Sequence, residues 1–313
     1  MDLDSGLGPL PVRNFQPVQL LFLELETESP EVLPPGKMGV RIQADVTSTV
    51  LSDFHPDSAG IIKTETIRGA LYIRYGLLPR LEAGVEIPVI YRYPGFMDEF
   101  IRNVEKSVKR LNPERIKLQS SPFDYRIVVR GDEIISAQSH EFGLSDIVLH
   151  AKGVMLYERP WLPMLSLRVA LKLPTGNRSD AFGSGRPEIG VGLAAEKHFL
   201  ESLIGYLNSN VVFSDGRFSA PGLYLQTAYM EMLGVEWRIL RHLSAHFQYE
   251  YYTSPFRGSG LNLLDHGVSE FAFGISHATQ SHLLIQLYAI ENINNPFGAA
   301  ADFTFGLAIS LFT

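Results

Sequence analysis

Large apolar residues recur at every second position in one segment after another from Gly36 to the end of the chain. The last segment shows the pattern most clearly, with large apolar residues at odd positions and small or weakly polar ones at even positions: Phe303, Phe305, Leu307, Ile309 and Leu311 against Thr304, Gly306, Ala308 and Ser310. A period of two is typical of a β-strand with two chemically different faces. The chain therefore predicts an all-β fold.

About twelve such segments follow one another, each near the 9–11 residues that a tilted strand needs to cross a bilayer. Their connections alternate in length. Residues 75–80, 157–162, 199–202, 239–242 and 277–281 form tight turns, whereas 52–60, 93–140, 173–185, 214–222, 254–266 and 292–301 form long, polar loops. Short turns at one end and long loops at the other are typical of outer-membrane barrels. We predict a transmembrane antiparallel up-and-down β-barrel over residues 36–313.

Residues 1–35 do not fit the wall of this barrel. They contain several breakers of regular structure, namely Pro11, Pro17, Pro30, Pro34 and Pro35, around a short stretch, 19–27, that could form a strand. A thirteenth wall strand there would put the N-terminus outside the cell, whereas twelve strands give the even number of single-chain bacterial barrels. We expect this N-terminal segment to lie in or beneath the lumen as a plug.

The longest loop, 93–140, has its own predicted structure. Apolar residues from Phe96 to Leu111 recur on one helical face, and Asn112-Pro113 ends that helix. Residues 126–130 and 133–135 flank Gly131-Asp132 and predict a hairpin, with the Arg130-Gly131-Asp132 triplet as its turn. The loop is either a lid over the extracellular mouth or an ordered surface decoration.

Composition narrows the class of protein. The net charge is −7, which argues against nucleic acid as a partner, and the sequence has no cysteine, which excludes disulfides and thiolate chemistry. No apolar run is long enough for a spanning helix of about 18 residues or more. The acidic start, Met1-Asp2-Leu3-Asp4, lacks the features of a signal peptide, so we expect the true start to lie upstream.

A soluble all-β protein is the competing interpretation, because a sandwich also has one apolar and one polar face. Three observations favour the membrane. The strands are longer than the roughly 5–6 residues typical of soluble proteins. Charged side chains lie at mid-strand. Aromatic residues gather at strand ends as in an interfacial girdle: Tyr75, Tyr91, Tyr157, Trp161, Trp237, Tyr249, Tyr251 and Phe303.

The polar faces give the candidate lumen-lining residues: Arg41, Asp45, Arg68, Arg74, Glu82, Glu86, Arg92, Asp146, His150, Lys152, Arg168, Lys172, Glu188, Glu196, Glu236, Arg238, His242, His246, Glu250, Glu270 and His282. Their mixed signs allow them either to pair and fill the lumen or to line a path for polar solutes. Three of these histidines are expected on one inner face, but their spacing does not predict a metal site. We expect no cofactor.

An enzyme on a barrel of this size is an alternative. A lipase-like barrel needs a His-x-Ser pair on a lipid-facing edge, but Ser244 and His246 have the reverse order and face inward. The sequence contains no Gly-x-Ser-x-Gly motif. We therefore expect no catalytic site, and a structural or adhesive barrel remains as a further alternative.

Two short motifs carry a resemblance to known families. Lys172-Leu173-Pro174-Thr175-Gly176 is similar to a strand end of the outer-membrane proteins of the phenol meta-pathway. Pro11-Val12-Arg13-Asn14, followed by Gln16-Pro17, resembles an uncharacterised family of Gram-negative outer-membrane β-barrels, and the likeness spans nearly the whole chain. The resemblance implies a barrel in the bacterial outer membrane and a transport role.

These observations lead to one expectation for function. The chain is expected to be a channel or transporter for a small solute, and a hydrophobic or aromatic solute is one option. Its expected partners are outer-membrane lipid and the barrel-assembly machinery. A lumen about twelve strands wide, narrowed by large inward side chains and by residues 1–35, predicts a constricted and selective pore.

Overall fold

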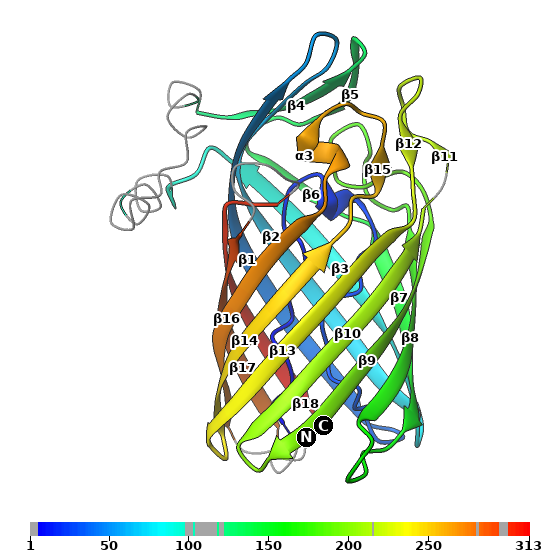
Figure 1. The fold of residues 1–313 in the computed structure, drawn as a ribbon, viewed down its shortest axis with the longest axis vertical. Coiled ribbons are helices and arrows are strands. Elements are labelled where there is room, and N and C mark those ends of the chain that lie inside the picture. The colour runs from blue at the N-terminus through cyan, green and yellow to red at the C-terminus, as the bar shows by residue number, and fades with distance from the viewer. Residues whose placement is uncertain are drawn as a thin grey trace.

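Twelve antiparallel strands close into a single barrel in the computed structural model, which describes residues 6–97, 103, 118, 122–214, 216–279, 282–293 and 300–313 (Figure 1). The wall strands are β1 (Met38–Phe54), β2 (Ala59–Leu78), β3 (Leu81–Tyr93), β7 (Ile147–Leu156), β8 (Met164–Leu173), β9 (Glu188–Leu200), β10 (Leu203–Phe213), β13 (Ala228–Leu240), β14 (Leu243–Tyr252), β16 (Val268–Thr279), β17 (Leu283–Asn292) and β18 (Phe303–Phe312). Pairing of β1 with both β2 and β18 closes the ring, and the predicted fold class is confirmed.

The period of two in the sequence corresponds to the two faces of this wall. In β18, Thr304, Ala308 and Ser310 are buried inside the barrel, whereas Phe305 and Leu311 are 47% and 53% exposed on its outer face. Half-exposed large apolar side chains recur in the same way on the other wall strands. An outer surface of this kind needs an apolar environment, which a lipid bilayer supplies.

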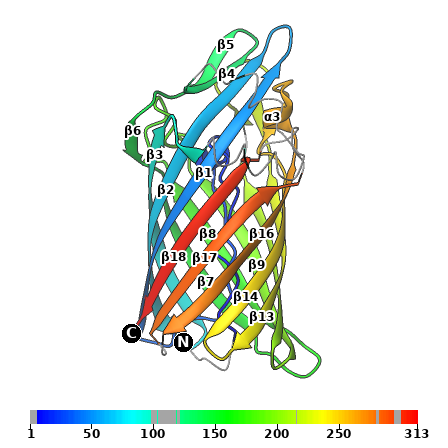
Figure 2. The same ribbon diagram turned by 90° about the vertical axis from the view of Figure 1, so that its left-hand side faces the viewer.

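The connections divide the barrel into two ends, which we call the turn end and the loop end. The turn end carries the short connections, such as 79–80 and 241–242, and the C-terminus (Figures 1 and 2). The long loop expected at 52–60 is wrong, because β1 and β2 continue to a tight turn at 55–58. The period of two fails there since Val50 and Leu51, on opposite faces of β1, are both buried, and Leu51 packs against loop-end elements.

The loop end carries the remaining elements. The predicted hairpin is confirmed as β4 (Asp124–Val129) and β5 (Asp132–Ser136), whose turn holds Arg130 and Gly131 at φ 55° and 84°, and β4 pairs with β2. A short strand β6 (Glu141–Leu144) pairs with β3, and β11 (Gly216–Arg217), β12 (Tyr224–Leu225) and β15 (Phe256–Arg257) form a small sheet beside the helix α3 (Asn262–Asp265). The helix predicted between Phe96 and Leu111 lies almost wholly outside the described residues. Among the helices that are described, none has the length and hydropathy to span a membrane.

These loops bury an apolar cluster over the barrel mouth, which we call the cap. It combines loop residues with the tops of the first strands and with three residues of the N-terminal segment: Val18, Leu21, Phe22, Leu51, Ile62, Tyr125, Ile127, Val129, Ile134, Ile135, Ala181, Phe218, Ala220, Leu223, Leu225, Phe256, Leu261, Leu263 and Leu264. Phe22 packs at 5.0 Å edge-to-face on Phe256 and at 5.8 Å from Phe218. The cap therefore covers the loop end around the tip of the N-terminal segment.

Candidate functional site in the barrel lumen

Residues 6–35 run inside the barrel as a loop with two limbs (Figure 2). The first limb rises from the turn end to a short 3-10 helix, η1 (Gln19–Leu21), and the second descends and leaves at the same end. The limbs contact each other where the Thr27 amide donates to the Val12 carbonyl at 3.2 Å. Instead of the short strand considered for 19–27, η1 is followed by extended chain that joins no sheet.

Inward-facing side chains of the wall supply the hydrogen bonds that a sheet would otherwise give the rising limb. Glu236 on β13 accepts from the Leu7 amide at 3.0 Å, and Gln248 on β14 accepts from the Leu10 amide at 2.5 Å. Gln286 on β17 donates to the Pro9 carbonyl at 3.1 Å. Buried backbone groups require such partners, so these polar side chains bind the segment as part of the folded core.

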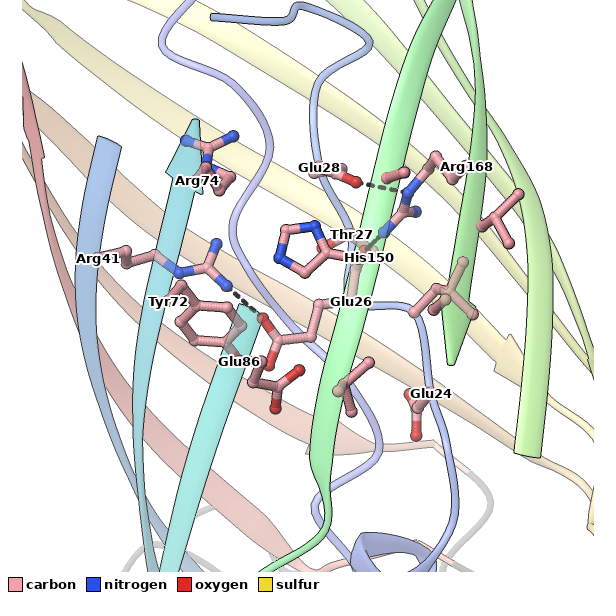
Figure 3. Close-up of a pocket in the computed structure, with 15 residues that line it drawn as sticks. Glu24, Glu26, Thr27, Glu28, Arg41, Tyr72, Arg74, Glu86, His150 and Arg168 are labelled. Atoms are coloured by element: carbon pink, nitrogen blue, oxygen red, sulfur yellow. Dashed lines mark hydrogen bonds and ion pairs between the residues drawn. The ribbon is translucent and has the colours of Figure 1, made fainter. Parts of the chain in front are cut away.

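The descending limb carries three glutamates at alternate positions, Glu24, Glu26 and Glu28, which we call the acidic ladder (Figure 3). Glu26 is buried and lies 2.5 Å from the Arg41 guanidinium and 3.3 Å from that of Arg68. The Tyr72 hydroxyl also donates to Glu26. Its carboxylate is thus held by side chains of β1 and β2.

The other two glutamates of the ladder have different partners. Glu28 lies 2.6 Å from Arg168 on β8 and 3.0 Å from Lys152 on β7. Glu24 accepts from the Asn14 amide at 2.7 Å, and therefore ties the two limbs together instead of binding the wall. Glu26 and Glu28 therefore bind one sector of the wall, with β1 and β2 holding Glu26 and, beyond β3, β7 and β8 holding Glu28.

Carboxylates of the wall share the same cations. Arg68 bonds Glu86 and lies 3.7 Å from Asp45, while Lys152 lies 3.2 Å from Glu82. The Tyr288 hydroxyl donates to Asp45 at 2.5 Å. We call this network, together with Glu26 and Glu28, the waist. Buried charges of this kind are tolerated because each has an opposite charge and hydrogen bonds beside it.

A second ion cluster lies between the waist and the cap. Lys172 on β8 contacts Asp146 at 2.7 Å and Glu188 at 3.2 Å, and its ammonium also donates to the Leu21 carbonyl at 2.8 Å. Glu188 accepts from the Leu23 amide at 2.6 Å. The descending limb is therefore fixed to the wall directly below its tip.

The structure distributes the predicted lumen-lining residues over three environments. Most are buried inside the barrel: Asp45, Arg68, Glu82, Glu86, Arg92, Asp146, Lys152, Arg168, Lys172, Glu188, Glu196, Glu236, His246, Glu250 and Glu270. Arg41, Arg74, His150 and Arg238 are partly buried, and His242 and His282 are exposed at turns. These two histidines lie just before β14 and β17 and away from buried His246. The described residues contain no group of metal-ligating side chains that could hold an ion.

The acidic ladder is the part of this site that the sequence interpretation missed. A signal for it exists, since Leu23-Glu24-Leu25-Glu26-Thr27-Glu28 alternates with a period of two like a wall strand. Leu23 and Leu25 pack in an apolar cluster with Val148, Ala170, Val212, Met230, Tyr252, Val268 and Ala300. One face of the descending limb therefore binds the waist, and the other fills the apolar half of the lumen.

Two cavities border Glu28 of the ladder. The larger, ≈ 520 Å³, lies between the rising limb, the exit of the descending limb and the wall at the turn end, and its lining includes Glu28, Arg41, Arg74 and Lys152. The smaller, ≈ 60 Å³, lies beside Glu26 and His150 (Figure 3). Both cavities border Thr27, Glu28, Arg41 and Arg74. The larger volume is within the roughly 300–1,000 Å³ typical of small-molecule sites.

The comparisons with known proteins agree with this architecture. The chain belongs to the family described as "Protein of unknown function (DUF3187)", which it matches over residues 1–311. No curated protein is a significant match. The COG4313 outer membrane channel from Pseudomonas putida F1 has a similar structure, with a TM-score of 0.63, 16% identity, and coverage of 93% of this chain and 100% of that one.

Two further solved barrels are more distant. The NanC porin has a TM-score of 0.49 at 8% identity, covering 88% of this chain and 98% of its own. The Pseudomonas putida toluene transporter TodX has a TM-score of 0.42 at 9% identity, covering 90% and 89%. At these identities the likeness to the COG4313 channel establishes the fold: a closed twelve-strand barrel of the outer-membrane type.

Proposed function

We propose that this protein is a bacterial outer-membrane channel for a small solute and that residues 6–35 close its lumen in the described state. The observation that carries the proposal is the acidic ladder, whose Glu26 and Glu28 fix the segment inside the lumen through ion pairs with β1, β2, β7 and β8. The COG4313 barrel from Pseudomonas putida F1 is described as an outer membrane channel, which supports the same role. Passage then requires the segment to move.

The solute is small, and the turn-end cavity of ≈ 520 Å³ is the space that would hold it. Apolar side chains such as Leu33 and Phe312 line this cavity together with Arg74 and Lys152, so it suits a solute with both apolar and polar parts. The Lys172-Leu173-Pro174-Thr175-Gly176 stretch supports a relationship to the outer-membrane proteins of the phenol meta-pathway, and with it an aromatic solute. Of the predicted hydrophobic or aromatic solutes, an aromatic one that also carries polar groups is retained as part of this proposal.

The proposed orientation places the loop end outside the cell and the turn end in the periplasm. Because the sequence contains no cysteine, Ser219→Cys at the loop end and Arg241→Cys at the turn end would each give a single labelling site. On intact cells, a membrane-impermeant maleimide should label the first and not the second. Labelling of Arg241→Cys alone would reverse the orientation.

Conductance tests the channel itself. Full-length protein in a planar bilayer should show small or no steady current, and deletion of residues 1–35 should raise it. Phe22→Ala provides a second variant that keeps the whole segment but removes its anchor in the cap, and it should show brief openings. Large steady currents from the intact chain, unchanged by either alteration, would contradict closure by the segment.

A structural barrel is the second candidate, and the packed state of the lumen is the observation that favours it. The ion pairs of the waist and the apolar cluster around Leu23 and Leu25 fill the middle of the barrel. If neither the deletion nor Phe22→Ala conducts while both barrels remain folded, the structural function is the better account.

A further inference from the structure

The waist has a charge balance that depends on the N-terminal segment. Five cations of the wall lie in this network: Arg41, Arg68, Arg74, Lys152 and Arg168. Three carboxylates of the wall contact them: Asp45, Glu82 and Glu86. Five minus three leaves the wall with an excess of two positive charges, and Glu26 and Glu28 supply two negative charges. The waist is neutral with the segment in place and cationic without it.

The two glutamates contact separate groups of cations. Arg41 and Arg68 lie at 2.5 and 3.3 Å from Glu26, and the Tyr72 hydroxyl adds a donor there. Arg168 and Lys152 lie at 2.6 and 3.0 Å from Glu28. Arginine pairs and hydroxyl donors of this kind are the usual means of carboxylate recognition. Each group therefore has the composition of a carboxylate subsite.

A solute in the turn-end cavity would reach these cations. Arg41, Arg74 and Lys152 line the ≈ 520 Å³ cavity, and Arg41 and Arg74 also border the smaller cavity beside Glu26. Arg68 is 2% exposed, so the cations nearest the turn end are met first and the most deeply buried one last. The site is thus connected to the turn-end cavity that the proposed function assigns to the solute.

We propose that the cations of the waist form a binding site for a small organic anion carrying more than one carboxylate, and that Glu26 and Glu28 occupy this site in the described state. The acidic ladder acts as an internal substitute for the solute, and the solute and the ladder compete for the same cations. This inference rests on the proposed function, because the solute must replace the descending limb as it passes.

Adipate, a linear dicarboxylate, is a suitable probe. In calorimetric titrations of the full-length protein in detergent, Glu26→Gln/Glu28→Gln should bind adipate about tenfold more tightly than the unaltered chain, a change of about 1.4 kcal/mol. Both substitutions keep the size of the side chain and remove the competing charge. The double variant should gain less affinity for hexanoate, which has one carboxylate, and no affinity for the dication hexamethylenediamine.

Two matched variants identify the source of the effect. Glu201→Gln removes an exposed glutamate at the turn end and should leave adipate binding unchanged. Adding Arg168→Gln to the double variant should remove most of the gain, because it deletes a cation of the Glu28 subsite. Folding of every variant is checked by its heat-dependent mobility in gels.

The inference is overturned if the folded double variant binds adipate no more tightly than the unaltered chain, or if the diamine gains as much as adipate. Should the double variant fail to fold, Glu28→Gln serves alone, because Glu28 is the more exposed of the two at 20%. Glu28→Gln should also bind adipate more tightly than the unaltered chain does. If its affinity for adipate is unchanged, the proposal is overturned as well.

Conductance separates this inference from the channel function. Tighter adipate binding without conductance in any variant would overturn the channel and leave the binding site. Conductance without any gain in adipate binding would leave the channel and overturn the binding site. If the double variant conducts, its reversal potential in a salt gradient should indicate selectivity for anions.

Discussion

The cap and the waist hold the same segment by different forces. In the cap, Val18, Leu21 and Phe22 are buried among apolar loop residues, and such contacts are strong and non-directional. In the waist, Glu26 and Glu28 are held by ion pairs. Such pairs contribute little net free energy to folding, but removing only one partner is strongly destabilising. An anionic solute can replace a glutamate in the waist, whereas it offers nothing to the cap. The difference suggests that the cap anchors the segment and that the waist releases it.

The largest effect is expected from breaking the waist on the wall side. Arg68→Met removes the cation shared by Glu26, Glu86 and Asp45 and leaves buried carboxylates without their partner. The cost should be about 3–5 kcal/mol. Urea unfolding of the barrel in lipid vesicles measures it, with exposed Lys37→Met as the control. Equal unfolding midpoints for the two variants would show that the waist contributes no stability.

The cap is tested by Phe22→Ala, which removes a ring packed between Phe218 and Phe256. Loss of this burial should cost about 3 kcal/mol, the lower part of the range for such changes, because surface loops can relax into the space. Hydrogen exchange should increase around the cap and stay slow at the waist. Phe54→Ala, at a 62% exposed site of the loop end, is the matched control. Uniform loosening of both regions would contradict separate anchoring.

These two regions also show how far the sequence could predict the molecule. The wall was predictable because each strand separates lipid from lumen, so the period of two extends over the whole length of β17 and β18. The ladder was not, because its alternation covers only six residues, 23–28, between prolines. Its partners, Arg41 and Arg168, are set by barrel closure, which brings together positions far apart in the chain.

Strand ends were the weak point of the same reasoning. A period of two assigns a face only inside a strand, and His242 and His282 precede the first residues of β14 and β17. At the loop end, β1 and β2 extend beyond the lipid-facing wall and are covered on both sides, so the alternation is lost while the strands continue. Both cases follow from the change of environment at the edge of the membrane-facing wall.

The outer face of the wall offers a third environment, in which a charge has no partner. Leu167→Arg on β8 should cost about 2 kcal/mol, because the residue lies in the half of the strand nearer the turn end and the cost of a lipid-facing arginine falls towards the interface. Trp161→Arg, at a 95% exposed turn position, is the control and should assemble normally. The yield of heat-shifted barrel from vesicles measures both, and equal yields would contradict the lipid-facing register.

The smallest effect concerns pH at the turn end. Partial burial raises the pKa of Glu158, but hydrogen bonds donated by Lys197 at 2.8 Å and by the His198 amide at 3.0 Å outweigh it and lower that pKa below its ordinary value. The contribution to stability is present above the unfolded pKa of 4.5 and is lost as the pH falls below it. Lowering the pH from 7 to 3, roughly across this window, should speed hydrogen exchange in the turn between β7 and β8 of the unaltered chain. The same change should have less effect in Glu158→Gln. Equal pH dependence of hydrogen exchange would exclude this role.

The central claim is that the segment closes the lumen and must leave the waist before solute passes. A disulfide between Pro30→Cys and Ser166→Cys tests it most directly, because the Ser166 hydroxyl donates to the Pro30 carbonyl and so places the descending limb beside β8. The pair is introduced into Glu26→Gln/Glu28→Gln and recorded in a planar bilayer. Oxidised channels should stay closed, and reduction in the same membrane should produce openings. Equal conductance before and after reduction, with the disulfide confirmed by mass, would contradict the account.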